Sequence, residues 1–301
     1  MNMVAAAYIG VIIIWSTTPL AIKWSGEGVG FLFGVASRMS IGALICLCLL
    51  LVLKRRLPLD RKAIQLYLAG AIAAYGAMLS VYWGAVYIPS GWISVLFGTT
   101  PVMTSLIAHL WLKEESLSLH HLAGMLLAIA GLWVIFAQAG SQPGDMAKFG
   151  VGLVLLAAFL HSLSTVLVKR MDQQRSIPAL TQTTGILLII VPFFWISWAL
   201  FGQDWPQQIQ AHSLYSILYL GIMGSVVGFM LYYYVLQHVM ASRIALITLL
   251  TPVTALLLGG WLNSEILTAR IWWGTSLILL GLSLYQWGAS LMRLLVVSKT
   301  R

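Results

Sequence analysis

Long apolar segments are the feature that most limits what this chain can fold into. Each is about 19 to 25 residues long, enough for an α-helix to cross a hydrocarbon layer of about 30 Å. Ten of them can be marked out, at residues 4–22, 31–53, 63–87, 91–112, 120–138, 149–168, 177–201, 213–237, 244–262 and 271–292. With 60 % hydrophobic and only 8 % charged residues, a water-soluble form would aggregate. The sequence therefore predicts an all-α polytopic membrane protein with ten transmembrane helices.

The basic residues predict how these helices are oriented. If both termini lie in the cytoplasm, thirteen Lys and Arg residues fall on that side. Only Lys23, Lys148 and Arg270 fall on the other side, and Arg38 lies within a span. Such a bias satisfies the positive-inside rule. Topology thus accounts for the net charge of +9, and no nucleic-acid partner is expected.

The two halves of the chain are related copies. The segment TPVMTSLIAHLWLKE at 100–114 aligns with TPVTALLLGGWLNSE at 251–265, and WSTTPLAIK at 15–23 aligns with HSLSTVLVK at 161–169. Gly124 and Gly131 are matched by Gly274 and Gly281. We predict two five-helix repeats, residues 1–140 and 141–301. Five is odd, so the second repeat is inverted, an arrangement typical of alternating-access transporters.

These segments also resemble a known family. WSTTPLAIK in the first span, and TPV…LKE…GMLLAIAGLWVI and TPV…NSE…GTSLILLGLSLY closing the two halves, are similar to the EamA family of the drug/metabolite transporter superfamily. The resemblance covers the whole chain. It implies a carrier in the bacterial inner membrane, often one that exports amino acids or related metabolites, and it leaves the substrate open.

Hydroxyl and aromatic side chains near the middle of the spans are candidates for the substrate path. Trp15 and His161 head equivalent stretches of the two repeats, each followed by hydroxyl residues. Alternatively, such hydroxyls bond to their own helix or a neighbour, worth on average about 0.6 kcal/mol. The candidate substrate-binding residues are Trp15, Ser16, Thr18, Tyr75, Tyr82, Trp83, Thr100, His161, Ser162, Thr165, Tyr233 and Thr251.

Prolines inside the spans are candidate hinges. Pro19, Pro101 and Pro252 each remove a helical hydrogen bond, and Pro101 and Pro252 hold equivalent places near the centres of their predicted spans. The alternative is a passive kink absorbed by packing.

Charge narrows the substrate class. All eight acidic residues lie in loops or at span ends, which makes a cation–proton antiporter a poor fit. Arg38 is the only charge well inside a span, and it snorkels to the headgroups, makes a structural hydrogen bond, or meets a substrate carboxylate. No metal site or cofactor is expected, and Cys46 and Cys48 are interpreted as apolar filler.

Together these observations predict a secondary transporter. We expect it to export small metabolites, amino acids or related zwitterionic or aromatic compounds, by alternating access. The expected partners are a small-molecule substrate and the lipid bilayer, and ten spans suffice for a monomer. The alternatives are a membrane-embedded enzyme, for which no acid–base pair or nucleophile motif is present, and a lipid-handling protein.

Overall fold

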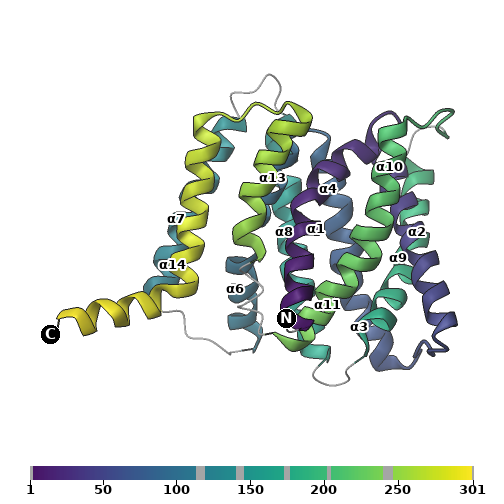
Figure 1. Cartoon of the computed structure of the whole chain (residues 1–301), viewed down its shortest axis with the longest axis horizontal. Helices are drawn as coiled ribbons and strands as arrows, with labels where there is room; N and C mark the ends of the chain where they lie inside the picture. Colours follow the sequence, from purple (N-terminus) through teal and green to yellow (C-terminus); the bar gives the residue numbers. More distant parts are fainter. Residues whose placement is uncertain are drawn as a thin grey trace.

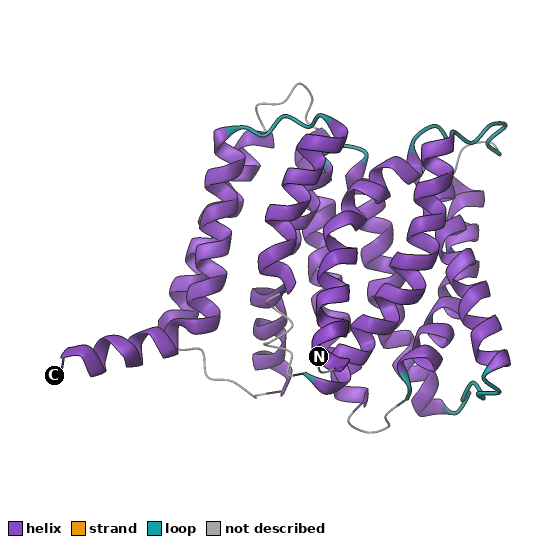
Figure 2. Ribbon diagram, viewed as in Figure 1, coloured by secondary structure: helices purple, strands orange, loops and turns teal. Residues whose placement is uncertain are grey.

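The computed structural model describes residues 3–112, 119–139, 146–172, 177–201, 205–239 and 247–299. Within these ranges the chain forms helices joined by short turns, and no strand occurs among them (Figure 2). An all-helical chain suits a lipid environment, because each helix satisfies its own backbone hydrogen bonds.

The helices follow one another along the chain and pack as a bundle (Figure 1). The first half contains α1 (Met3–Gly26), α2 (Phe31–Val52), α3 (Arg61–Ala71), η1 (Ile72–Ala77), α4 (Met78–Ala85), α5 (Ser90–Phe97), α6 (Thr100–Leu112) and α7 (Leu119–Ala139). The second half contains α8 (Met146–Asp172), α9 (Ala179–Phe201), α10 (Ala211–Tyr219), η2 (Leu220–Val227), α11 (Gly228–His238), α13 (Ile247–Asn263) and α14 (Ala269–Lys299).

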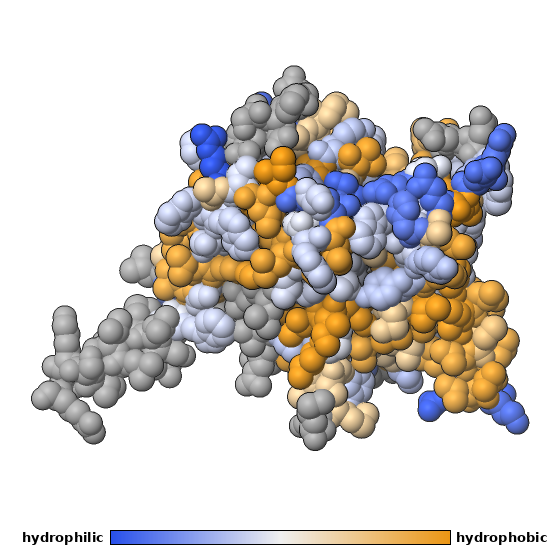
Figure 3. All heavy atoms as spheres, turned by 45° about the horizontal axis from the view of Figure 1, so that its top comes forward, coloured by the Kyte–Doolittle hydropathy of each residue, from blue (hydrophilic) through white to orange (hydrophobic). Residues whose placement is uncertain are grey.

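The described residues contain seven helices long and apolar enough to cross a membrane. They are Met3–Gly26, Phe31–Val52, Arg61–Ala85, Ser90–Ala108, Met146–Asp172, Ala179–Phe201 and Ala211–His238, and a shorter apolar helix covers His120–Ile135. Apolar side chains cover the lower right flank in Figure 3, while hydrophilic residues gather at the end turned forward. The chain is therefore a multi-pass membrane protein. α1 begins and α14 ends at the same end of the bundle, the lower end in Figure 1.

The fourth predicted span, 91–112, is interrupted halfway. α5 ends at Phe97, a turn occupies Gly98 and Thr99, and α6 begins at Thr100. Pro101 consequently lies in the first turn of α6, where its missing N–H costs little, and not at the centre of a continuous helix as predicted. Pro19 and Pro252 do lie inside helices, α1 and α13.

Two long helices contain a wider π-helical segment that the sequence did not predict. η1 interrupts the helix between α3 and α4, and η2 interrupts the helix between α10 and α11. They fall at corresponding places in the two halves of the chain. π-helical turns are rare and are frequently found at functional sites.

α7 and α14 pack against each other backbone to backbone at one edge of the bundle (Figure 1). A Cβ added at Gly124 would lie 2.6 Å from the carbonyl oxygen of Gly281, and one at Gly131 would lie 2.6 Å from that of Gly274. Only glycine permits this approach. The contact exchanges the equivalent glycines of the two halves, as a two-fold axis between them would require.

Candidate functional site

A central cavity lies between both halves of the chain. The space in it that the centre of a water molecule can occupy is about 100 Å³. α1, α2, α4 and α5 contribute to its wall from the first half, α8, α11 and α13 contribute from the second, and both π-helical segments reach it. The lining residues are Trp15, Thr18, Pro19, Ile22, Arg38, Ala73, Ala74, Met78, Val81, Ile93, Ser94, Phe97, His161, Gly224, Phe229, Tyr232, Tyr233 and Thr251.

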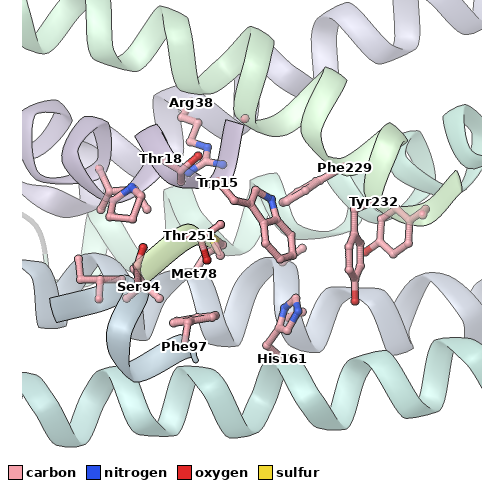
Figure 4. A pocket seen from close by; sticks show the side chains of 18 residues that line it. Trp15, Thr18, Arg38, Met78, Ser94, Phe97, His161, Phe229, Tyr232 and Thr251 are labelled. Carbon is pink, nitrogen blue, oxygen red and sulfur yellow. The ribbon is translucent and has the colours of Figure 1, made fainter. Parts of the chain in front are cut away.

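Three aromatic rings from three helices meet at one side of the cavity (Figure 4). The ring centroids of Trp15 and His161 lie 5.7 Å apart, edge to face. Those of Trp15 and Tyr232 lie 5.3 Å apart, and those of His161 and Tyr232 lie 5.5 Å apart. Phe97 extends the group, 5.9 Å from His161. These four residues, the aromatic cluster, give the cavity large polarisable faces that suit an apolar or aromatic solute.

The hydroxyls of α1 bond mainly to their own helix. Thr18 Oγ1 donates to the Ile14 carbonyl at 2.7 Å, and Ser16 Oγ donates to the Ile12 carbonyl at 2.8 Å. Ser16 Oγ also accepts a hydrogen bond from Thr254 Oγ1 at 2.7 Å, which links α1 to α13. Each of these hydroxyls therefore donates its hydrogen bond within α1, and that of Ser16 also joins the two halves of the chain.

The equivalent hydroxyls of α8 follow the same rule. Ser162 Oγ lies 2.8 Å from the Ala158 carbonyl and 3.1 Å from that of Thr100, which lies beside the break between α5 and α6. Thr165 Oγ1 donates to the His161 carbonyl and shares a 2.8 Å hydrogen bond with Tyr232 Oη. This contact holds the tyrosine in the aromatic cluster.

A charged connection closes the bundle at the end of α1, the upper end in Figure 1. The Glu265 carboxylate accepts hydrogen bonds from the backbone N–H groups of Ser90 at 2.8 Å and Gly91 at 3.2 Å, at the start of α5. Lys23 Nζ lies 3.9 Å from the same carboxylate and 3.4 Å from the Ile88 carbonyl. The Glu265 carboxylate thus places a negative charge at the N-terminus of α5, where it is favourable. Through Lys23 and the start of α5, it joins α1 and α5 to the turn after α13.

Lys169 has a corresponding place at the end of α8. Its Nζ donates to the Leu236 carbonyl at 2.6 Å and lies 3.4 Å from the Val239 carbonyl, at the end of α11. Lys23 and Lys169 end the aligned segments WSTTPLAIK and HSLSTVLVK. In the structure each binds carbonyl groups at or just beyond the end of a neighbouring helix, where a cation is favoured.

The structure brings part of the predicted residue set to the cavity. The residues that line it are Trp15, Thr18, Pro19, Arg38, His161, Tyr233 and Thr251. Those outside its lining are Ser16, Tyr75, Tyr82, Trp83, Thr100, Ser162, Thr165, Pro101 and Pro252. Most of the second group are buried in the helix bundle.

Tyr75 and Trp83 lie away from the cavity altogether. Tyr75 Oη is 2.7 Å from Ser197 Oγ of α9. Trp83 is 40 % exposed and packs between Phe31 and Phe149, so it faces outwards and is not as deep as its sequence position suggested.

Sequence reasoning missed much of the apolar wall and one aromatic residue. Tyr232 belongs to the aromatic cluster, whereas the prediction named its neighbour Tyr233. The repeat did not separate the two, because Tyr82 matches Tyr232 at an offset of 150 and Tyr233 at 151. The other missed residues are Ile22, Ala73, Ala74, Met78, Val81, Ile93, Ser94, Phe97, Gly224 and Phe229. These are mostly ordinary membrane-helix residues without a distinguishing pattern.

Comparison with known proteins gives one family across the whole chain. The model of the EamA-like transporter family matches residues 2–137 and 148–286. An uncharacterised transporter of Bacillus subtilis, YoaV, is 26 % identical and covers 94 % of this chain and 96 % of its own. A probable amino-acid metabolite efflux pump of Salmonella typhimurium is 30 % identical over 62 % of this chain and 64 % of its own. A probable terminal-alkyne amino-acid exporter of Streptantibioticus cattleyicolor is 25 % identical over 84 % of this chain and 83 % of its own.

One solved crystal structure has the same fold. It aligns with a TM-score of 0.70 over 97 % of this chain and 99 % of its own, at 18 % sequence identity. At that identity the likeness supports the fold and nothing further.

Proposed function

The chain belongs to the EamA-like transporter family, and on that premise we propose that it is a secondary carrier that exports small metabolites through the central cavity. Family membership and the names of the relatives make it a transporter rather than an enzyme. Two relatives are named for the export of amino acids or amino-acid metabolites, which supports a substrate of that class. The observation that carries the proposal is a cavity lined by both halves of the chain.

The proposed architecture is ten spans in two inverted repeats, residues 1–140 and 141–301. Three observations support this arrangement. The glycines of α7 and α14 pair crosswise, Lys23 and Lys169 bind carbonyls of corresponding helices, and η1 and η2 interrupt corresponding spans.

Alternating access is the proposed mechanism, because inverted halves can exchange conformations so that the cavity opens to one side and then to the other. The break at Gly98 and Thr99, with Pro101 just after it, is a proposed hinge beside the cavity. Pro19 and Pro252 would allow α1 and α13 to bend. Discontinuous helices at a binding site are a recurring feature of such carriers.

The proposed substrate contacts are the cavity-lining members of the predicted set together with Tyr232 and Ser94. Trp15, His161 and Tyr232 would pack against the apolar body of the solute. Thr18, Thr251 and Ser94 would present polar atoms near it. Tyr82 and Thr165 would position Arg38 and Tyr232 without touching the solute.

We place the carrier in a bacterial inner membrane as a monomer, with both termini in the cytoplasm. The distribution of Lys and Arg supports this orientation. The start of α1 and the end of α14 also lie toward the same side (Figure 1).

The test is a flux assay with purified protein in liposomes. A panel of amino acids and related acids, amides and amines is loaded, and carrier-dependent efflux is followed by mass spectrometry. We expect efflux of at least one member, reduced about ten-fold by Trp15→Ala or His161→Ala. Absence of carrier-dependent efflux across the panel would reject the proposal, and transfer of lipid between leaflets would favour a lipid-handling protein instead.

A further inference from the structure

Arg38 is a buried cation in the wall of the cavity. Its side chain belongs to α2 and is 2 % exposed. Nε donates to Ser225 Oγ at 2.9 Å, and Nη1 lies 3.4 Å from Tyr82 Oη. In Figure 4 Arg38 lies at the upper side of the view, beside Thr18, and His161 and Phe97 lie at the lower side. The side chain therefore points inwards to η2 and α4 and does not extend to the membrane surface.

The positive charge of Arg38 has no carboxylate beside it among the described residues. The carboxylate of Glu27 contacts His212, and that of Glu265 contacts Lys23 and the start of α5, both away from the cavity lining. The two groups that Arg38 does contact, hydroxyls of serine and tyrosine, are neutral. Burying a cation without a counter-charge is unfavourable, and a bound anion would relieve this cost.

One edge of the guanidinium is left for a ligand. Nη2 has no acceptor within the part of the chain that the structure describes. It lies against Gly224 of η2, where an added Cβ would be 2.8 Å from Nη2 and 3.3 Å from Cζ. Glycine at this place keeps the edge free of a side chain. A carboxylate is the group that best fits an arginine edge, because it accepts two parallel N–H bonds.

We propose that the carrier selects organic anions, with Arg38 binding a single carboxylate and the aromatic cluster binding an apolar body. This inference rests on the proposed function and concerns the same cavity. The wall contains no described carboxylate to receive an ammonium group. An anion therefore binds better than the zwitterion with the same body, and a cation is repelled.

This selectivity fixes how export is driven. The empty cavity carries one positive charge and the loaded cavity is neutral. Each export cycle then moves one negative charge out of the cell. A membrane potential of about 100 mV, negative inside, drives a univalent anion outwards against roughly a fifty-fold concentration ratio. The cycle needs no coupled proton or cation.

The experiment uses three solutes that share one body: 3-phenylpropanoate, phenylalanine and phenylalaninamide. Their binding to the purified carrier is measured by calorimetry. Their flux is measured in liposomes whose potential is set by potassium and valinomycin, with protein-free liposomes subtracted. We expect the acid to bind about ten-fold tighter than phenylalanine, the amide not to bind, and acid efflux to rise when the inside is made negative.

The variants isolate the role of Arg38. Arg38→Gln should reduce the preference for the acid to less than about three-fold, whereas Arg38→Lys should keep part of it. Arg270→Gln is the matched control, because Arg270 is exposed and lies outside the cavity. If Arg38→Gln does not fold, the wild-type charge series and the effect of potential still decide the matter.

Two results would overturn the inference while leaving the carrier intact: equal binding of the three solutes, or efflux that ignores the potential. Preference for the acid that survives in a folded Arg38→Gln variant would also overturn it. Absence of flux for the broad panel would instead reject the proposed function.

Discussion

Trp15 and His161 meet edge to face with their ring centroids 5.7 Å apart, although 146 positions separate them in the chain. They stand at equivalent positions of α1 and α8 and both line the central cavity. Hydrogen bonds explain why α1 tolerates the polar stretch after Trp15. Thr18 satisfies its hydroxyl on its own helix, and Ser16 does so while also accepting a hydrogen bond from α13.

Replacing Trp15 tests the aromatic cluster. Trp15→Ala removes two ring contacts, worth together about 1 to 3 kcal/mol, so transport at low solute concentration should fall about ten-fold. Trp15→Phe should lose less. The matched control is Trp133→Ala, because Trp133 is 70 % exposed on α7 and does not reach the cavity. Equal losses in the two alanine variants would show that the cluster has no specific role.

Replacing two tyrosines, one in the cavity wall and one away from it, tests which of them affects solute binding. Tyr232→Phe and Tyr75→Phe each remove one hydroxyl contact, with Thr165 at 2.8 Å and with Ser197 at 2.7 Å. Their unfolding free energies should drop alike, by about 1 kcal/mol. Only Tyr232 lines the cavity, so only its variant should weaken the apparent affinity for the exported solute, about three- to ten-fold. Similar transport constants for both variants would contradict this assignment.

The glycine contact of α7 and α14 is expected to limit stability. Gly124→Ala places a Cβ 2.6 Å from a backbone oxygen, which must shift at a cost of about 1 to 3 kcal/mol. Thermal unfolding in detergent should occur about 2 to 6 °C lower. Gly152→Ala is the control, because nothing lies within 4 Å of a Cβ there. The close packing would be disproved if Gly124→Ala unfolded at the temperature of the control.

Glu265 is expected to stabilise the end of the bundle at which α1 finishes. Its side chain is 5 % exposed and accepts backbone hydrogen bonds at the start of α5, so Glu265→Gln should cost about 1.5 to 3 kcal/mol. Glu27→Gln is the comparison. The Glu27 carboxylate also contacts a basic side chain, that of His212, but it is 42 % exposed, and such pairs contribute little. Thermal unfolding of both variants measures the difference, and equal shifts would argue against the buried contact.

The sequence predicted the helices well, because hydropathy reports them directly. The second predicted span, 31–53, corresponds to α2 at Phe31–Val52, and the seventh, 177–201, to α9 at Ala179–Phe201. The repeated WSTTPLAIK and HSLSTVLVK segments also predicted Trp15 and His161 as site residues, and both line the cavity.

The rest could not be predicted because lipid and packed protein interior are both apolar. Trp83 and Phe97 are both large aromatic residues of apolar segments, yet Trp83 faces outwards and Phe97 lines the cavity. Three consecutive tyrosines at 232–234 gave no sign of which ring turns inwards. The break at Gly98 and Thr99 and the π-helical segments depend on neighbouring helices, which a local pattern does not report.

Locking the two halves together tests alternating access most directly. Ser16 and Thr254 lie on α1 and α13, outside the cavity lining, with their hydroxyl oxygens 2.7 Å apart. A Ser16→Cys/Thr254→Cys pair, made with Cys46→Ala and Cys48→Ala to remove the native thiols, should form a disulfide on oxidation. Solute efflux from liposomes is then measured before oxidation, after it, and after reduction, with each single cysteine variant as the control. We predict that efflux falls to the level of protein-free liposomes when the pair is oxidised and returns on reduction. The account would be contradicted if the fully cross-linked carrier exported solute as fast as the carrier whose cysteines are reduced.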